Sequence, residues 1–259
     1  MKTFNALLVI AVRDLTKLLR DRGRILASLI FPLVFVGVLG NSLNSNLSAD
    51  VGYSFLTFVY LGVIGQNLFQ STASGLISLI EDRENDFSQS MFIAPVSRYI
   101  IILGKIIGES MVATVQLLGI GLMAFIFRIP FTWPQLLGIL AVVPLITLLG
   151  GAFGVLVMAN LSNQKQANQI FPFLIFPQFF LSGVFSPIKE LPIYLLVLSR
   201  ISPMTYAVDL VRSIYYIGNP AYDKVVINSM GTNLMVVLGM AVVMIVAGTL
   251  IFVRNERNK

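Results

Sequence analysis

The sequence contains no cysteine and no histidine. Disulfides, thiolate chemistry, histidine-ligated metals and imidazole acid–base catalysis are therefore excluded for this chain, and we predict neither a metal site nor catalytic residues. Charge is also scarce. Asp, Glu, Lys and Arg make up 12% of the 259 residues, against about 25% in a globular domain, and the mean hydropathy is +0.86. A water-soluble domain is excluded.

Long apolar runs dominate the chain instead. A hydrocarbon core of roughly 30 Å needs about 20 helical residues, and backbone groups in lipid must be satisfied internally. We therefore predict an all-α membrane protein whose residues 25–259 form one transmembrane domain. The first run is longer than a signal-peptide core, so we expect it to stay in the mature protein. The six predicted spans are residues 25–43, 53–80, 99–127, 134–161, 168–186 and 233–253.

The basic residues predict the orientation of these spans. Most of the eighteen Lys and Arg fall before the first span, between the second and third, and after the last. Cytoplasmic connections carry an excess of these residues. We predict a multi-pass protein of the cell (inner) membrane with both termini in the cytoplasm. The formal net charge of +6 then reflects topology and anionic lipid head groups, and no nucleic-acid binding is expected.

Residues 1–24 form a segment with basic side chains at helical spacing. Arg13, Lys17 and Arg20 recur on one face, and an apolar face begins at Leu8. This pattern predicts an amphipathic helix in the membrane interface. Two roles stay open: an anchor to membrane lipids that sets the topology, or a contact edge for a cytoplasmic partner.

The connection between the fifth and sixth spans is long and only partly polar. Its apolar stretches at 191–198 and 205–217 cover only about 12 Å and about 20 Å, too little to cross a bilayer. Prolines, among them Pro192 and Pro203, break the connection into short pieces. We predict that residues 187–217 form two short external re-entrant helices, dipping into the outer leaflet or lying on it.

The connection after the second span has the most specific pattern. It reads EDRENDFSQSMFIAPVSR, with acids around one arginine at its start. Phe87 and Met91 stand at i and i+4, and with Phe92 they make an apolar face on a short helix before Pro95. An exposed apolar patch rimmed by charge is typical of a docking site. Insertion of these aromatic side chains into the lipid interface is the alternative.

This connection resembles that of the type 2 ABC transporter permeases, the ABC-2 superfamily, which includes multidrug- and daunorubicin-resistance-type transmembrane subunits. The similarity lies in the acid-Arg-Glu start, the Ala-Pro-Val-Ser-Arg stretch and the following Gly104-Lys105. The segment 179–212, with its Leu-Ser-Gly, Ser-Pro and Thr-Tyr pairs, is similar to the family's external segment. Asp86 stands where the family often has glycine. The resemblance implies that residues 81–95 form a coupling helix, with contacts from Glu81, Arg83, Glu84, Phe87, Met91, Phe92, Pro95 and Arg98.

The resemblance also implies partners. A permease of this family works with a cytoplasmic ABC ATPase, and the family precedent is two copies of each subunit, here a permease homodimer. No G-x-x-x-x-G-K-[ST] phosphate loop occurs, because Ile106 follows the Gly104-Lys105 pair where a hydroxyl residue is needed. We therefore predict no enzyme activity and no cofactor on this chain. ATP and Mg²⁺ would be bound by the partner ATPase.

Three further groups of residues have two interpretations each. Lys105 and Glu109, four residues apart near one end of a span, form a structural ion pair or a gating element. Asp209 and Arg212, at i and i+3, form an ion pair or contact substrate. The aromatic group of the fifth span covers lipid-facing surface or lines a translocation path; its candidate path residues are Phe176, Phe179 and Phe180. The spacings Gly104/Gly108 and Gly150/Gly154 permit close helix contact.

The function expected from the resemblance is the permease half of an ATP-driven exporter of an amphipathic or lipid-like substrate. A polysaccharide or teichoic-acid exporter of the same superfamily is the alternative. A secondary transporter or channel is the rival of another class, but it would need coupling charges at mid-membrane, where these spans are nearly free of charge. The substrate itself is not specified by the sequence.

Overall fold

The computed structural model describes residues 2–40, 52–84, 98–161 and 163–257, and within these ranges the chain is helical with no β-strand. The predicted all-α class is thereby confirmed. The elements, in chain order, are α1 (Lys2–Arg20), α2 (Arg22–Val34), the π-helical η1 (Phe35–Gly40), α4 (Phe55–Glu84), α6 (Arg98–Ile126), α7 (Trp133–Met158), α8 (Gln164–Leu181), the 3₁₀ turn η2 (Ile188–Glu190), α9 (Ile193–Ile201), α10 (Pro203–Tyr215), α11 (Tyr222–Val225) and α12 (Met230–Arg257).

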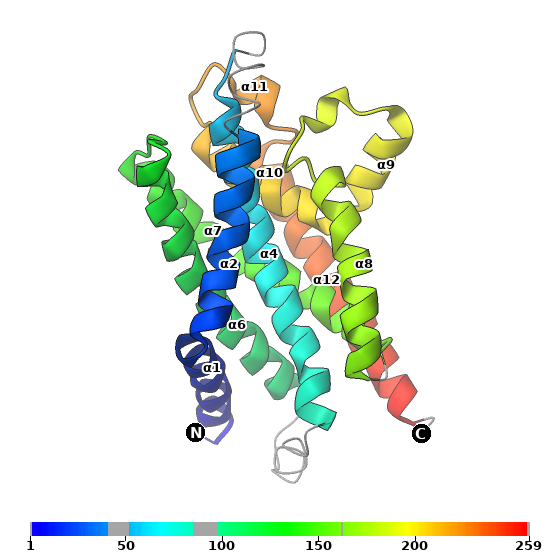
Figure 1. The fold of residues 1–259 in the computed structure, drawn as a ribbon. Helices are drawn as coiled ribbons and strands as arrows, with labels where there is room; N and C mark the ends of the chain where they lie inside the picture. Colours follow the sequence, from blue (N-terminus) through cyan, green and yellow to red (C-terminus); the bar gives the residue numbers. More distant parts are fainter. Residues whose placement is uncertain (1, 41–51, 85–97, 162, 258–259) are drawn as a thin grey trace.

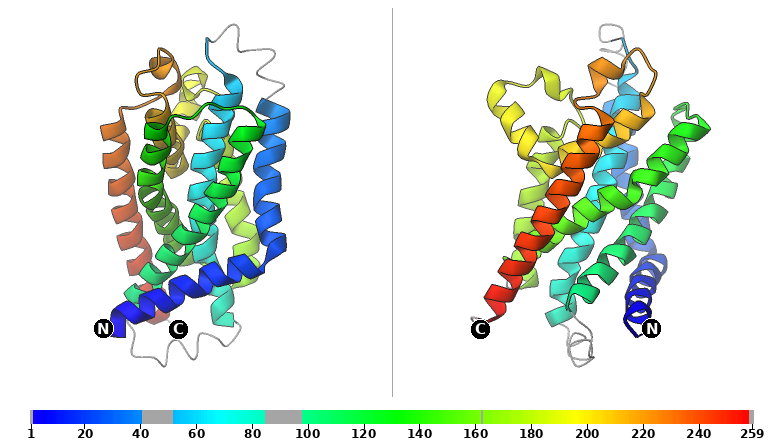
Figure 2. Two further views of the ribbon diagram at one scale, coloured as in Figure 1. Left: turned by 90° about the vertical axis from the view of Figure 1, so that its left-hand side faces the viewer. Right: turned by 180° about the vertical axis from the view of Figure 1, so that it is seen from behind.

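The long helices form an elongated bundle with both chain termini at one end, which we call the N/C end (Figure 1). Helix α4 ends there and α6 begins there, whereas α9, α10 and α11 lie toward the opposite end. Helix α1 runs across the N/C end and packs mainly on α6, and α2 rises from it at a sharp angle (Figure 2). The predicted helix over 1–24 is therefore present up to Arg20, where the chain turns.

Helices occupy the six stretches predicted as spans, except for residues 41–43, which lie outside the described residues, but not all of these helices qualify as spans. Among the described residues, three stretches are long and apolar enough to cross a membrane: Ile100–Ile126, Trp133–Met158 and Tyr222–Ile251. The bent pair of helices at 193–215 would make a fourth. Helix α4 has 30 residues, but Gln66, Asn67 and Gln70 lower its hydropathy. Helix α8 begins and ends a few residues before the predicted 168–186. In the part of the chain that the structure describes, the fold is thus all-α, with three to four membrane-capable helices.

Helix α4 is the centre of the bundle and packs on α7, α6 and α10. Glycines on α7 allow this close approach. A Cβ atom on Gly150 would lie 2.2 Å from the carbonyl oxygen of Phe69, and one on Gly154 would lie 2.7 Å from the carbonyl oxygen of Ala73. The two glycines of this predicted spacing therefore let the α7 backbone contact the α4 backbone directly.

The connection between α8 and α12 contains the two short helices expected at 187–217. Helices α9 and α10 meet at an angle of 87°, across the break at Ser202 and Pro203. The two helices differ in burial: most of α9 is exposed, whereas every residue of α10 is buried. Helix α10 packs between α4, α7 and α12, so it is inserted into the bundle and does not lie on its surface.

Candidate functional site

The predicted coupling segment joins two helices at the N/C end. Glu81, Arg83 and Glu84 belong to the last turn of α4, and Arg98 is the first residue of α6. The connection between them, with Phe87, Met91, Phe92 and Pro95, lies outside the described residues. The structure therefore places both ends of the segment at the end of the bundle that carries the termini and α1 (Figure 1).

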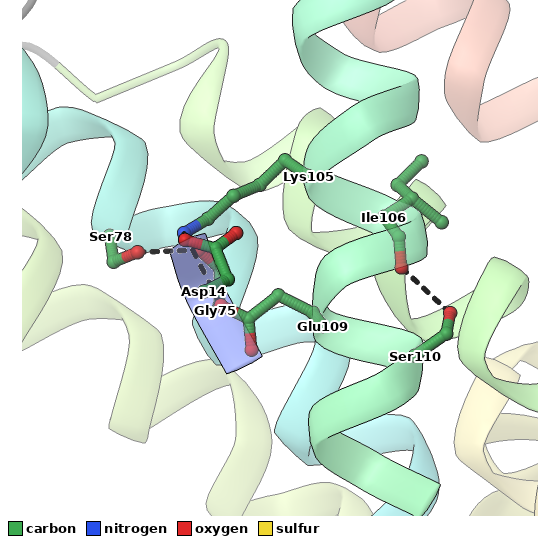
Figure 3. A network of polar contacts seen from close by, with 7 residues as sticks. All are labelled: Asp14, Gly75, Ser78, Lys105, Ile106, Glu109 and Ser110. Carbon is green, nitrogen blue, oxygen red and sulfur yellow. Dashed lines mark hydrogen bonds and ion pairs between the residues drawn. The ribbon is translucent and has the colours of Figure 1, made fainter. Parts of the chain in front are cut away.

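A buried cluster of charges lies near the same end. The Nζ atom of Lys105 on α6 is 2.9 Å from Oδ1 of Asp14 on α1 and 3.3 Å from Oε1 of Glu109 on α6 (Figure 3). The three side chains are only 2–3% exposed. The pair expected from the spacing of Lys105 and Glu109 is present, and Asp14 joins it. We call these three residues the charge triad.

Two glycines make room for the charge triad. A Cβ atom on Gly75 of α4 would lie 2.0 Å from Cδ of Glu109, and one on Gly108 would lie 3.0 Å from Oδ2 of Asp14. Helices α1, α4 and α6 therefore meet at the triad, with α4 pressed against the Glu109 carboxylate (Figure 3). With two carboxylates around one ammonium group, the triad depends on Lys105 for its stability.

Helix α1 has three distinct faces. Ile10, Ala11, Asp14 and Leu18 are buried against the bundle. The apolar residues Leu8, Val12 and Leu19 are about half exposed, at 43–55%. The basic residues predicted to share a face line an open depression of about 660 Å³, formed by Arg13, Thr16, Lys17, Arg20 and Asp21. One face is thus available to lipid and another to anionic groups.

The expectation of an Asp209–Arg212 ion pair is wrong, because each side chain has other partners. Asp209 is fully buried in α10 and turns toward the segment that enters α12. Its carboxylate accepts three hydrogen bonds of 2.8–2.9 Å, from the backbone N–H groups of Ile227 and Asn228 and the side-chain amide of Asn233. Asp209 therefore fixes α10 to the start of α12.

Arg212 fixes α10 on the other side. Its guanidinium group donates to the carbonyl oxygens of Phe58, at 3.0 Å, and Val184, at 3.2 Å. The same group lies 3.5 Å from the centroid of the Phe58 ring, an arrangement typical of a cation–π contact. At 1% exposure Arg212 contacts the protein interior, so its role is to hold α10 against α4.

The aromatic group of α8 divides between the core and the surface. Phe176 and Phe180 are 62% and 56% exposed, whereas Phe179 is 8% exposed and packs in the core. Phe179 therefore does not share the exposed face of Phe176 and Phe180. The ring centroids of Phe176 and Phe180 are 5.5 Å apart, those of Phe180 and Phe185 are 6.1 Å apart, and those of Phe185 and Phe35 are 5.1 Å apart. This aromatic row joins α8 to η1.

A polar face on α4 was missed by the sequence analysis. Five side chains at spacings of three and four residues are partly exposed in a helix that is otherwise mostly buried. We call them the α4 polar face: Asn67, Gln70, Ser71, Ser74 and Ser78. The signal was present as a run of amide and hydroxyl residues with helical period inside the predicted span 53–80.

Comparison with known proteins identifies the family. The family model described as ABC-2 type transporter matches residues 5–216, from the first turns of α1 to just beyond the end of α10. The chain belongs to the ABC-2 transporter family. Membership places it among transmembrane transport proteins. The resemblance that was drawn from the connection at 81–98 and the segment 179–212 is confirmed.

Three relatives show how far the similarity extends. The ABC-2 chain is 31% identical over 144 residues to a probable multidrug ABC transporter permease, YbhR, of Escherichia coli strain K12. The aligned residues make up 54% of this chain and 38% of YbhR. It is 26% identical over 204 residues to nodulation protein J of Rhizobium leguminosarum bv. trifolii, covering 77% and 76% of the two chains. It is 24% identical over 215 residues to the putative transport permease ycf38 of Cyanophora paradoxa, covering 81% and 73%.

Proposed function

We propose that this ABC-2 protein is the permease subunit of an ATP-driven exporter that moves an amphipathic or lipid-like substrate out of the cytoplasm or the inner leaflet. The observation that carries the proposal is the family match over residues 5–216. Two features support it. The sequence has no phosphate-binding loop, so the energy source would be ATP and Mg²⁺ on a separate ATPase. The relative YbhR is described as a probable multidrug permease.

In this proposal the N/C end faces the cytoplasm of a cell whose inner membrane the chain crosses six times. The six spans would be α2 with η1, α4, α6, α7, α8 and α12. The excess of basic residues around the N/C end supports this orientation. The α9–α10 pair would then dip into the bundle from the outer side, and α1 would lie in the inner interface with its exposed leucines in lipid.

Coupling would pass through the connection between α4 and α6. Phe87, Met91 and Phe92 would dock on the ATPase, and closure of a pair of ATPases would push α4 and α6 as rigid bodies. The charge triad supports this route, because it joins α1, α4 and α6 a short distance from that connection. The permease would act as a homodimer, so that two permeases and two ATPases make the transporter.

The substrate would leave along the face of the bundle that carries Phe176 and Phe180. These exposed aromatic side chains suit an apolar moiety, and their row reaches across to η1. A secondary transporter would need charges in the middle of its spans. Among the residues whose burial is described, the buried charges instead belong to the charge triad, toward the N/C end, and to α10, toward the opposite end (Figure 1).

The experiment is reconstitution with a candidate ABC ATPase from the same source. The purified chain alone should hydrolyse no ATP, whereas the complex in nanodiscs should hydrolyse ATP and sustain ATP-dependent transport in vesicles. The double variant Phe87→Ala/Phe92→Ala should weaken complex formation and lower coupled hydrolysis. Hydrolysis by the chain alone, or uptake driven by a proton gradient in ATP-free vesicles, would refute the proposal.

A further inference from the structure

The α4 polar face places hydrogen-bonding groups where they are costly. Polar side chains inside membrane spans almost always face the bundle interior or a water-filled cavity. Helix α4 is packed by α6, α7 and α10 on its other sides, and the polar face is the side that stays partly exposed. From Asn67 to Ser78 it extends for about 16 Å at roughly 1.5 Å per residue, about half of a hydrocarbon core.

Some of these groups are already satisfied within the helix. Ser74 donates to the carbonyl oxygen of Gln70 at 2.6 Å, and Ser78 donates to that of Gly75 at 2.7 Å. The side-chain amide of Gln66 donates to Oε1 of Gln70 at 3.0 Å. Such bonds are the ordinary way in which a membrane helix accommodates polar residues. They do not account for the whole face.

Three buried oxygen atoms have no such partner. In the described part of the chain, no hydrogen bond reaches Oε1 of Gln66, Oδ1 of Asn67 or Oγ of Ser71. Two of these atoms can only accept, and the hydroxyl group can accept or donate. A buried polar atom without a partner calls for an explanation, and an absent ligand or water is one. The groups that would complete this set are O–H and N–H donors.

The surroundings of Asn67 and Ser71 favour an uncharged ligand. Residues 66–80 contain no ionisable side chain, and the charges of the triad, which α4 contacts at Gly75, are already paired with one another. A charged head group beside Asn67 and Ser71 would therefore be desolvated without a free counter-charge. Helix α4 also contacts η1 and α8, which carry Phe35 and Phe180 of the aromatic row. Helix α4, with its uncharged acceptors, is thus in contact with two elements that carry aromatic side chains.

We propose that the α4 polar face binds the transported substrate through uncharged hydroxyl or amide groups, so that the substrate class is an amphiphile with a neutral, hydrogen-bond-donating head group. This inference rests on the proposed function, because it takes the transport path to run along α4. Asn67 and Ser71 determine the head-group preference, and the aromatic row contacts the apolar part of the substrate.

The test is photolabelling of the purified full chain in nanodiscs with two matched probes. Both carry the same diazirine-bearing alkyl chain, and their head groups are glucosyl and trimethylammonium. We expect the glucosyl probe to label residues 67–78, mapped by mass spectrometry, in preference to the trimethylammonium probe. The variant Asn67→Leu/Ser71→Ala should lower glucosyl labelling by about fivefold, the effect of losing one or two hydrogen bonds.

Thr72→Val is the matched control, since Thr72 is on α4 but fully buried away from the polar face. Each probe should label Thr72→Val to the same extent as the unmodified chain. If the double variant does not fold, as judged by gel filtration, Ser71→Ala alone carries the test by the same criterion. Equal labelling by both probes, or an unchanged signal in the variant, would overturn the inference. Binding of the ATPase is measured separately. A chain that binds the ATPase but shows no preference for the glucosyl probe refutes only this inference.

Discussion

Replacing Lys105 with methionine removes the ammonium group that lies between the carboxylates of Asp14 and Glu109. Breaking a buried ion pair by removing one partner costs about 3–5 kcal/mol, because the other charge is left without compensation. All three side chains are at most 3% exposed, so water cannot replace the lost contacts. At about 2–4 °C per kcal/mol, Lys105→Met should lower the thermal midpoint by roughly 6–20 °C.

The assay is thermal unfolding of the purified chain in nanodiscs, followed by intrinsic fluorescence. Lys165→Met is the matched control, because Lys165 is exposed at the start of α8 and its replacement should leave the midpoint nearly unchanged. The triple variant Asp14→Asn/Lys105→Met/Glu109→Gln should recover most of the loss, since it leaves no unpaired charge. A stabilising role of the Lys105 ion pairs is refuted if Lys105→Met is as stable as Lys165→Met, or if the triple variant is no more stable than Lys105→Met.

Three further outcomes follow from the packing and the topology. Gly150→Ala should destabilise the chain by about 1–3 kcal/mol in the same assay, since the new Cβ atom would meet the Phe69 carbonyl oxygen. Gly231→Ala is the control and should be tolerated, because a Cβ atom there meets no atom within 4 Å. Asp209→Asn should cost about 1.5–3 kcal/mol, because an amide cannot accept all three hydrogen bonds, and an unchanged midpoint would contradict this. In this cysteine-free chain, an impermeant maleimide on intact cells should label Lys189→Cys but not Lys165→Cys, and the reverse pattern would invert the topology.

The positions of the helices were predictable because the hydropathy of a stretch depends only on the residues within it. A helix occupies each stretch predicted as a span, as far as the structure describes it, and the proline at 203, which begins α10, separates α10 from α9. The depth of α10 was not predictable in the same way. Its burial depends on contacts with α4, α7 and α12, which come from distant parts of the sequence.

The same distinction applies to the candidate site. The spacing of Lys105 and Glu109 predicted their contact, because residues at i and i+4 share a helix face. The contact of Lys105 with Asp14 joins residues 91 positions apart, so no local pattern could reveal it. Asp209 and Arg212 have suitable spacing for a pair, but burial in α10 gave each of them backbone partners on opposite sides. The predicted contacts of Phe87, Met91 and Phe92 with an ATPase stay a prediction.

Cross-linking from the connection between α4 and α6 tests the central claim most directly. Since the chain has no cysteine, Phe92→Cys provides a unique thiol for a short bifunctional reagent in the assembled complex. Lys189→Cys, at the opposite end of the bundle, is the control. The account predicts a cross-link from position 92 to the ABC ATPase and none from position 189. A complex that hydrolyses ATP but cross-links from position 189 and not from position 92 would contradict it.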